Sequence, residues 1–400
     1  MFNSKKITLL PLVFVAGLPA VAQVQAPKIG GLAQIWYTQM MDNSLRHFSS
    51  PFPYYPTTYK FPGGTGTHYN ENGFSLKRIE LSASGAISDN VEYRIMYDVS
   101  LQSGILQDVY IKYKAPMNVE FQVGQFKILG LDAATIAPMN MLFVEHSQLG
   151  LLFGSRDRGA SASIGFGNPE AFSGRAHVAV FNGSGKNTEV NAQKDLAIKA
   201  DFRYGKKNFF GIYSLQGSTN QADAGNLTAG SFGSNGPSAS TILDNKDKTT
   251  VYGAFYEFDN SAFYGSAEVA TGTLGRFFRS LNVDTAQREH LDQTFLGINA
   301  VAGYTFGHHK IVARYNNMNY NYGDDWYGTV NPYVLPNGDD ISPNYTEITG
   351  GYIYAFNPAS FRSANIKVNY TMRSKNFLIN PTTGAATGGD TLSVAFQVSF

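Results

Sequence analysis

Charged side chains recur at alternate positions of short apolar segments. Arg78 and Glu80 have one apolar residue between them, and Lys199, Asp201 and Arg203 are spaced in the same way. Spacing by two puts side chains on one face of an extended strand, so these segments have a charged face and an apolar face. The cations predicted on charged faces are Arg78, Arg94, Lys112, Lys114, Arg175, Lys199, Arg203, Lys310, Arg314, Lys367 and Arg373. The carboxylates are Glu80, Glu92, Asp98, Asp108, Glu120, Asp195, Asp201, Glu257, Glu268 and Glu347.

Residue patterns for catalysis or metal binding are weak. The chain has no cysteine and no Gly-x-Ser-x-Gly sequence, so neither a thiol nucleophile nor a serine nucleophile elbow is indicated. His308 and His309 adjoin each other in a predicted turn without a third ligand nearby. We therefore expect no enzyme, no catalytic residue, no metal site and no cofactor. The formal net charge of +1 also gives no basic stripe for nucleic acid.

Sixteen segments alternate apolar and polar residues and would each have one charged or polar face and one apolar face. The last, residues 389–400, has Leu392, Val394, Phe396, Val398 and Phe400 on one face. Such alternation indicates strands with one apolar face. The segments are 29–40, 74–86, 91–101, 105–114, 118–127, 158–167, 173–182, 194–204, 207–217, 248–258, 261–272, 293–306, 309–319, 345–356, 361–373 and 389–400.

The gaps between these segments alternate in length. Every second gap is a short turn rich in Gly, Asn, Asp or Pro, such as 205–206, 259–260 and 307–308, whereas most intervening gaps are long. Short turns on one rim and long loops on the other are typical of outer-membrane barrels. The alternative, an exported β-sandwich, would have strands of about five or six residues. The sequence predicts an all-β, 16-stranded antiparallel transmembrane β-barrel with apolar side chains facing lipid.

The first 22 residues have the pattern of a secretory signal peptide. Lys5 and Lys6 precede an apolar run over 7–18, and Ala20-Val21-Ala22 is a small-x-small cleavage site. We expect cleavage after Ala22, with residues 23–400 forming a single barrel domain in the outer membrane of a Gram-negative-type bacterium.

The gap 128–157 is long and unusually apolar. A loop this apolar is not expected in bulk water, so we expect it to fold inward against the barrel wall and narrow the lumen; the alternative is packing on a neighbouring subunit. Lys127, Arg156 and Arg158 stand at its two ends and should be near neighbours, with Glu145 or Asp157 neutralising an arginine. Glu145 and His146 lie within the loop and are further candidates for the constriction.

Seven motifs follow one another between residues 74 and 186. They are Lys77-Arg78-Ile79-Glu80-Leu81, Tyr93-Arg94-Ile95-Met96-Tyr97-Asp98, Gln107-Asp108-Val109-Tyr110-Ile111, Val123-Gly124-Gln125-Phe126-Lys127, Phe143-Val144-Glu145-His146-Ser147, Arg156-Asp157-Arg158-Gly159 and Val180-Phe181-Asn182-Gly183. In order and spacing this half of the chain resembles the phosphate-selective porins O and P. The resemblance implies a sixteen-stranded trimeric porin, often anion-selective through inward Lys and Arg. That family's loop typically reads Phe-Met-Glu-Arg-Ser, so His146 stands where an arginine is expected.

These observations together predict a water-filled channel for passive diffusion of small hydrophilic solutes, with weak anion preference. Expected partners are outer-membrane lipid, two further copies of the chain in a homotrimer, small solutes or anions in transit, and the barrel-assembly machinery, which Phe396, Val398 and Phe400 would signal. Two alternatives stay open. One is a surface adhesin or receptor barrel acting through long loops, and the other is a channel specific for an organic solute or sugar.

Overall fold

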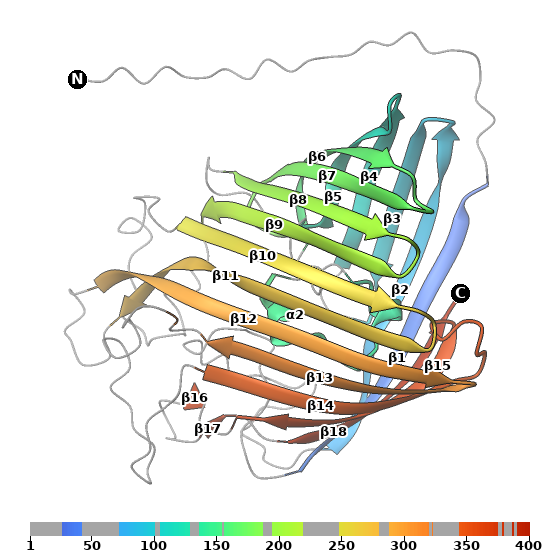
Figure 1. Ribbon diagram of the computed structural model, residues 1–400. Coiled ribbons are helices and arrows are strands. Elements are labelled where there is room, and N and C mark those ends of the chain that lie inside the picture. The colour runs from blue at the N-terminus through green and yellow to red at the C-terminus, as the bar shows by residue number, and fades with distance from the viewer. Residues whose placement is uncertain are drawn as a thin grey trace.

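A computed structural model gives the arrangement of the chain (Figure 1). It describes residues 26–41, 72–100, 105–128, 136–153, 156–186, 194–218, 248–279, 288–319, 322, 344–374, 378–379, 386–387 and 390–400. The expected signal peptide, residues 1–22, lies outside the described residues, and so does most of the long-loop sequence. Within the described part of the chain, no helix is long and apolar enough to cross a membrane.

Sixteen antiparallel strands close into one barrel, as predicted. They are β1 (Lys28–Met40), β2 (Asn72–Ser88), β3 (Val91–Asp98), β4 (Ile105–Ala115), β5 (Val119–Lys127), β6 (Arg156–Gly167), β7 (Phe172–Phe181), β8 (Asp195–Tyr204), β9 (Asn208–Ser218), β10 (Lys248–Asp259), β11 (Phe263–Arg279), β12 (Arg288–Phe306), β13 (His309–Asn319), β14 (Asn344–Ala355), β15 (Ala364–Arg373) and β18 (Thr391–Ser399). Consecutive strands are neighbours, and β1 closes the barrel by pairing with β18. Closure leaves no unpaired edge, which a bilayer requires.

The two faces of the wall are inverted relative to a soluble barrel. Outward side chains are apolar and exposed, for example Ile111 at 51%, Val123 at 57% and Ile212 at 62%. Polar and charged side chains are buried on the inner face, for example Glu347 at 1% and Lys367 at 2%. Such an outer surface suits lipid and such an interior suits water, as in outer-membrane barrels. The period-two prediction of which face is charged is therefore confirmed.

Several boundaries differ from those expected. β11 and β12 extend as a hairpin into 273–279 and 288–292, which were predicted to be loop. β6 begins at Arg156, so Arg156 and Asp157 belong to the wall and not to the loop. Residues 361–363 form a turn before β15. A two-residue pair, β16 (Leu378–Ile379) with β17 (Ala386–Thr387), lies outside the barrel sheet in the predicted loop 374–388.

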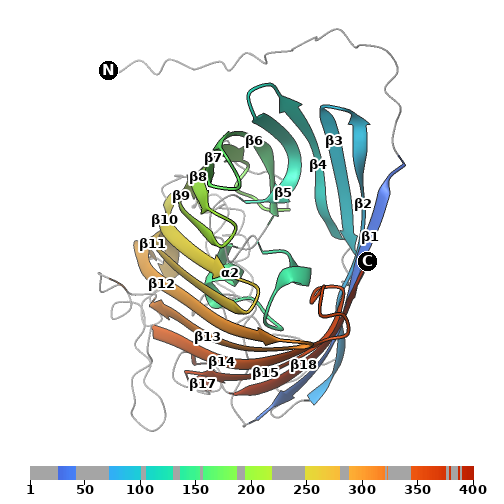
Figure 2. The same cartoon turned by 45° about the vertical axis from the view of Figure 1, so that its right-hand side comes forward.

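The segment between β5 and β6 lies inside the barrel. Its described part, residues 136–153, holds the 3-10 helix η1 (Pro138–Asn140) and the short helix α2 (Gln148–Phe153). Figure 2 shows this segment within the ring of strands. α2 packs against β12 and β13, far around the wall from the strands that the segment joins. The expectation that the apolar loop folds inward against the wall is confirmed for these residues.

Candidate functional site

The interior segment 136–153 is attached to the wall by hydrogen bonds that mostly use its backbone. Amide and ammonium side chains from four strands supply the partners. The contacts are Gln34 Nε2 to the Pro138 carbonyl (3.4 Å), Gln397 Nε2 to the Met139 carbonyl (3.0 Å), Lys367 Nζ to the Met141 carbonyl (2.6 Å), the Val144 amide to Asn369 Oδ1 (2.6 Å) and the Gln148 amide to Asn316 Oδ1 (3.2 Å). These bonds satisfy backbone groups that a non-helical segment would otherwise leave unpaired away from water. The wall therefore determines the path of the segment across the lumen.

Apolar contacts add to this attachment. Val144 packs with Trp36 and Ala395 on one part of the wall. Phe143 packs with Val312 and Ile353 on another. The segment is thus held both by hydrogen bonds and by buried apolar area, which explains why its sequence is so apolar.

Leu149 of α2 is fully buried at a place where the wall has no side chain. A Cβ at Gly297 of β12 would lie 2.5 Å from Leu149 Cδ1 and 2.6 Å from the sulfur of Met318. A methyl group cannot occupy such a space without displacing a neighbour. The lack of a side chain at Gly297 therefore leaves the space in which Leu149 of α2 packs against the wall.

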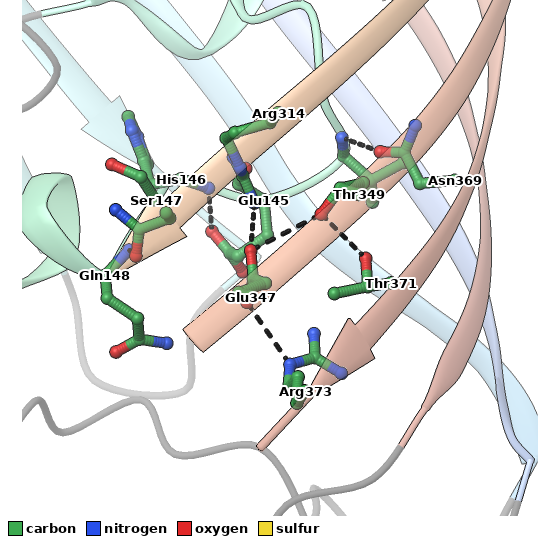
Figure 3. Close-up of polar contacts among 12 residues, drawn as sticks. Glu145, His146, Ser147, Gln148, Arg314, Glu347, Thr349, Asn369, Thr371 and Arg373 are labelled. Carbon is green, nitrogen blue, oxygen red and sulfur yellow. Dashed lines mark hydrogen bonds and ion pairs between the residues drawn. The ribbon is translucent and has the colours of Figure 1, made fainter. Parts of the chain in front are cut away.

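Arg314 of β13 joins the segment to a buried charge cluster (Figure 3). Its Nη1 donates to the Glu145 carbonyl at 2.8 Å, and its guanidinium lies 4.6 Å from the centre of the Phe143 ring. Its Nη2 is paired with the Glu347 carboxylate, to which Arg373 Nε also donates at 3.2 Å. Glu347 is 1% exposed. The buried Glu347 carboxylate thus pairs with both Arg314 and Arg373, and Arg314 in turn binds the interior segment.

The carboxylate of Glu145 is contacted by two cations of β2. Lys77 Nζ lies 3.0 Å from Glu145 Oε2, and Arg78 Nη2 lies 3.7 Å from Glu145 Oε1. Two successive residues can reach the lumen because β2 has a register shift opposite Gln34 and Ile35, where Lys77 has no partner on β1. Lys77 also lies 4.5 Å from the centre of the Trp36 ring. Strand parity had placed only Arg78 inside, so sequence reasoning missed Lys77, and period two alone carries no signal for a bulge.

His146 sits deep within the barrel beside Glu145. Its backbone amide donates to Glu145 Oε1 at 3.0 Å. Enclosure by the surrounding protein disfavours the imidazolium and lowers the pKa of His146 below its usual range, and the nearby Arg78, Lys127 and Arg314 lower it further, against an opposing effect of Glu145. His146 is therefore neutral at physiological pH.

The three cations at the ends of the loop are placed by the pairing of β5 with β6. Lys127 is opposite Arg156, and Arg158 is opposite Gln125, so the first two are direct neighbours. Lys127 Nζ donates to the Ile136 carbonyl at 3.0 Å. Arg158 donates to the Lys186 carbonyl at 2.8 Å.

Arg156 pairs with a carboxylate from another strand. Its Nε donates to Asp108 Oδ1 at 2.5 Å, and Asp108 also lies 3.4 Å from Arg94. The carboxylate of Asp157 accepts from the backbone amides of Arg158 at 2.6 Å and Gly183 at 2.7 Å. Glu145 and Asp157 were the carboxylates expected to neutralise an arginine at the ends of the loop; Arg156 pairs instead with Asp108, which β4 brings to this site from a distant part of the sequence.

Other inward charges pair between neighbouring strands. Glu120 is contacted by Arg175 at 3.1 Å and Lys112 at 3.6 Å. Asp201 accepts from His177 at 2.9 Å, if that nitrogen carries the proton. Lys199 Nζ lies 4.7 Å from the centre of the Phe255 ring. The inward candidates are thus spread around the wall, and the interior segment brings only some of them together.

The adjacent histidines have structural partners. His308 Nδ1 lies 2.8 Å from the Ala355 carbonyl, and His309 Nδ1 lies 2.7 Å from the Tyr352 hydroxyl. Among the described residues, no group of three His, Asp or Glu side chains is arranged to hold a metal ion.

A cavity of about 850 Å³ lies between the interior segment and strands β8 to β15, near their short turns. Its wall includes Arg203, Lys310, Arg314, Arg362 and Lys367, against three carboxylates: Glu145, Glu257 and Asp259. The lumen on this side of the segment is therefore wide enough for a small solute and has more cations than carboxylates in its lining.

Comparison with known proteins agrees with this architecture. The barrel resembles the outer membrane channel DcaP of Acinetobacter baumannii, with a TM-score of 0.55, 13% identity, and 94% of this chain and 97% of that chain covered. It also resembles the anion-selective porin of Comamonas acidovorans (TM-score 0.54, 9% identity, 94% and 99% covered) and the trimer form of OmpT of Vibrio cholerae (TM-score 0.50, 10% identity, 94% and 100% covered). At these identities the likeness shows the fold.

The sequence comparison is more specific about the family. None of the curated proteins matches this sequence. Residues 57–310, more than half of the chain, match the family phosphate-selective porin O and P. That match covers the seven motifs and the interior segment. Together with the closed sixteen-stranded barrel, it supports an outer-membrane channel, and the chain belongs to the phosphate-selective porin O and P family.

Proposed function

We propose that the barrel is a water-filled pore through which small hydrophilic solutes diffuse passively across the outer membrane, with weak anion preference. The observation that carries this proposal is the contact of Glu145, the one carboxylate of residues 136–153, with both Lys77 and Arg78. A narrowing with two cations for one carboxylate raises the local concentration of anions, and its low-dielectric surroundings focus the field.

Three more inward carboxylates each contact two cations. Asp108 contacts Arg94 and Arg156, Glu120 contacts Lys112 and Arg175, and Glu347 contacts Arg314 and Arg373. Each of these clusters has an excess of one positive charge. Over the whole inner face, however, cations and carboxylates are nearly balanced, so the preference should be weak.

The neutral imidazole of His146 also argues against a strong anion site. The family resemblance places an arginine at this position, and a neutral ring cannot replace its charge. We propose general anion preference for this chain and not a dedicated phosphate site.

Assembly and location follow from the same proposal. Residues 1–22 would direct export and be cleaved after Ala22, and the chain would form a homotrimer, an arrangement for which the trimer form of OmpT of Vibrio cholerae is a precedent on the same fold. Phe396, Val398 and Phe400 are 44%, 55% and 74% exposed on the outer side of the closing strand β18. A row of exposed apolar side chains at the C-terminus suits both outer-membrane lipid and recognition by the barrel-assembly machinery.

The reversal potential in a KCl gradient across a planar bilayer tests the ion preference. The wild-type pore should give a potential displaced modestly toward the chloride equilibrium value. Glu145→Gln should increase this displacement, because Lys77 and Arg78 lose their counter-charge, and Arg78→Gln should reduce it. Glu92→Gln is a matched control, because Glu92 pairs with Lys114 where both side chains are about 40% exposed and screening is strong.

Two results would refute the proposal. Cation preference of the wild-type pore would contradict the assigned sign. A correctly assembled barrel with no ion current would favour the surface adhesin or receptor instead.

A further inference from the structure

Several cations of the cavity beneath the interior segment lie against aromatic rings. On β8, the Arg203 guanidinium is 4.3 Å from the centre of the Phe209 ring. On β13, Lys310 Nζ is 5.1 Å from the centre of the Phe361 ring. Neither cation has a carboxylate oxygen within 4.0 Å among the described residues, although Asp259 of the cavity wall acts on Lys310 from farther away. A ring face attracts a cation without neutralising it, so both remain able to attract an anion.

The rings belong to larger apolar surfaces that reach the cavity. Phe361 and Val301 pack at the edge of the cluster of Phe143, Val312 and Ile353. On the other side of the cavity, Phe209 packs against Phe255 with ring centres 5.0 Å apart. Arg203 and Lys310 are therefore each bordered by apolar area within the water-filled lumen.

β13 contributes two of the cations that lie against aromatic rings. Near the short turn its inward residues are Lys310, Val312 and Arg314, so two cations flank one apolar side chain. The interior segment supplies Phe143 over Arg314, and the turn after β14 supplies Phe361 over Lys310. These rings come from outside β13, so the pairing of each cation with a ring depends on the folded barrel and is absent from the sequence of this strand.

Such a surface distinguishes classes of anion. An inorganic anion would be attracted by the cations but would gain nothing from the rings. An organic carboxylate with an apolar ring can place its carboxylate at Arg203 or Lys310 and its ring against Phe209 or Phe361. Partial burial of one ring face corresponds to about tenfold tighter binding.

We propose that this cavity is a binding site for small organic anions that carry an apolar ring, with Arg203 or Lys310 binding the carboxylate and the adjoining Phe209 or Phe361 contacting the ring. The site rests on the proposed pore function and narrows its substrate class. The solute would pause there in transit.

Block of the chloride current by added benzoate, compared with acetate, tests the site. Both probes carry one carboxylate and differ in the ring. In the wild-type pore, benzoate should reduce the unitary conductance at a concentration about tenfold lower than acetate. Phe209→Ala or Phe361→Ala should reduce this ratio toward one, and Lys310→Gln should weaken block by both probes.

Phe210→Ala is the matched control. Phe210 is the next residue on β9, and its ring stacks with Phe202 at 5.4 Å on the other face of the wall, so this variant should keep the wild-type ratio. Equal block by benzoate and acetate in an anion-preferring wild-type pore would overturn the organic-anion site alone. Cation preference or no current in the wild type would instead overturn the proposed function on which it rests.

Discussion

The packing of α2 against Gly297 allows a test, without any change of charge, of whether the interior segment narrows the pore. In Gly297→Ala, the new methyl group would overlap Leu149 and Met318, which are both fully buried and have little room to move. Because the backbone of Gly297 pairs with Ala270 and Met318 in the sheet, the barrel itself should still form. The expected effect is displacement of α2 from the wall.

The size of the effect follows from the contacts that hold α2. Burying Leu149 contributes about 2–3 kcal/mol, and the hydrogen bond from the Gln148 amide to Asn316 contributes about 1 kcal/mol. Overpacking costs about 1–3 kcal/mol. The fraction of molecules in which α2 has left the wall should then rise from below about 1% to about 15% when the substitution removes some 2.5 kcal/mol of the free energy that holds α2 there.

Single-channel recording measures this directly. Gly297→Ala should show added open-channel noise or brief states of higher conductance, while the unboiled protein keeps the altered electrophoretic mobility of a folded barrel. Gly350→Ala is the control, because a Cβ there meets nothing within 4 Å. A Gly297→Ala trace that matches both the wild type and the control would refute the assignment of α2 as part of the narrowing.

Three further predictions follow from the described contacts. Glu347→Gln removes the carboxylate that Arg314 and Arg373 share, which should cost about 3–5 kcal/mol and lower the temperature at which the barrel unfolds in detergent; an unchanged temperature would contradict the buried cluster. Because burial lowers the pKa of His146, its ring should stay neutral as the pH falls through about 6.5, so the reversal potential of wild type and His146→Gln should have the same pH profile between about pH 5 and about pH 8. A wild-type step that disappears in the variant would show that His146 titrates there. Deletion of Phe400, whose backbone closes the barrel through two hydrogen bonds to β1 of 2.9 and 3.1 Å, should reduce the folded protein in outer-membrane fractions; a normal amount would refute an assembly role.

Local pattern was sufficient to predict the wall. In a strand, alternate side chains lie on opposite faces, so each apolar-polar repeat such as 364–373 indicates a strand and its lipid face without knowledge of its neighbours. The alternation of short and long gaps then gave the order of hairpins. This information is local, and all sixteen strands were found from it.

Bulges and strand extensions, which depend on how neighbouring strands pair, were not predictable from the alternation. Lys77 reaches the lumen because β2 bulges against β1, and the bulge depends on how two strands pair. Likewise, β11 and β12 pair beyond their regular alternation, to Arg279 and Arg288. Period two describes one strand at a time, so it gives no information about register between strands.

The sequence by itself determined that the chain forms a barrel, which side chains of its regular strands face the interior, and that residues 128–157 are too apolar to lie in water. Only the tertiary structure decided where that loop lies and which charges it meets. Glu145 meets Lys77, Arg78 and Arg314, and Arg156 meets Asp108, across separations of 48 to 169 residues for the hydrogen-bonded pairs. Closing the barrel brings these residues together, because the partners lie on separate strands and the height of each in the lumen depends on the pairing of every strand between them.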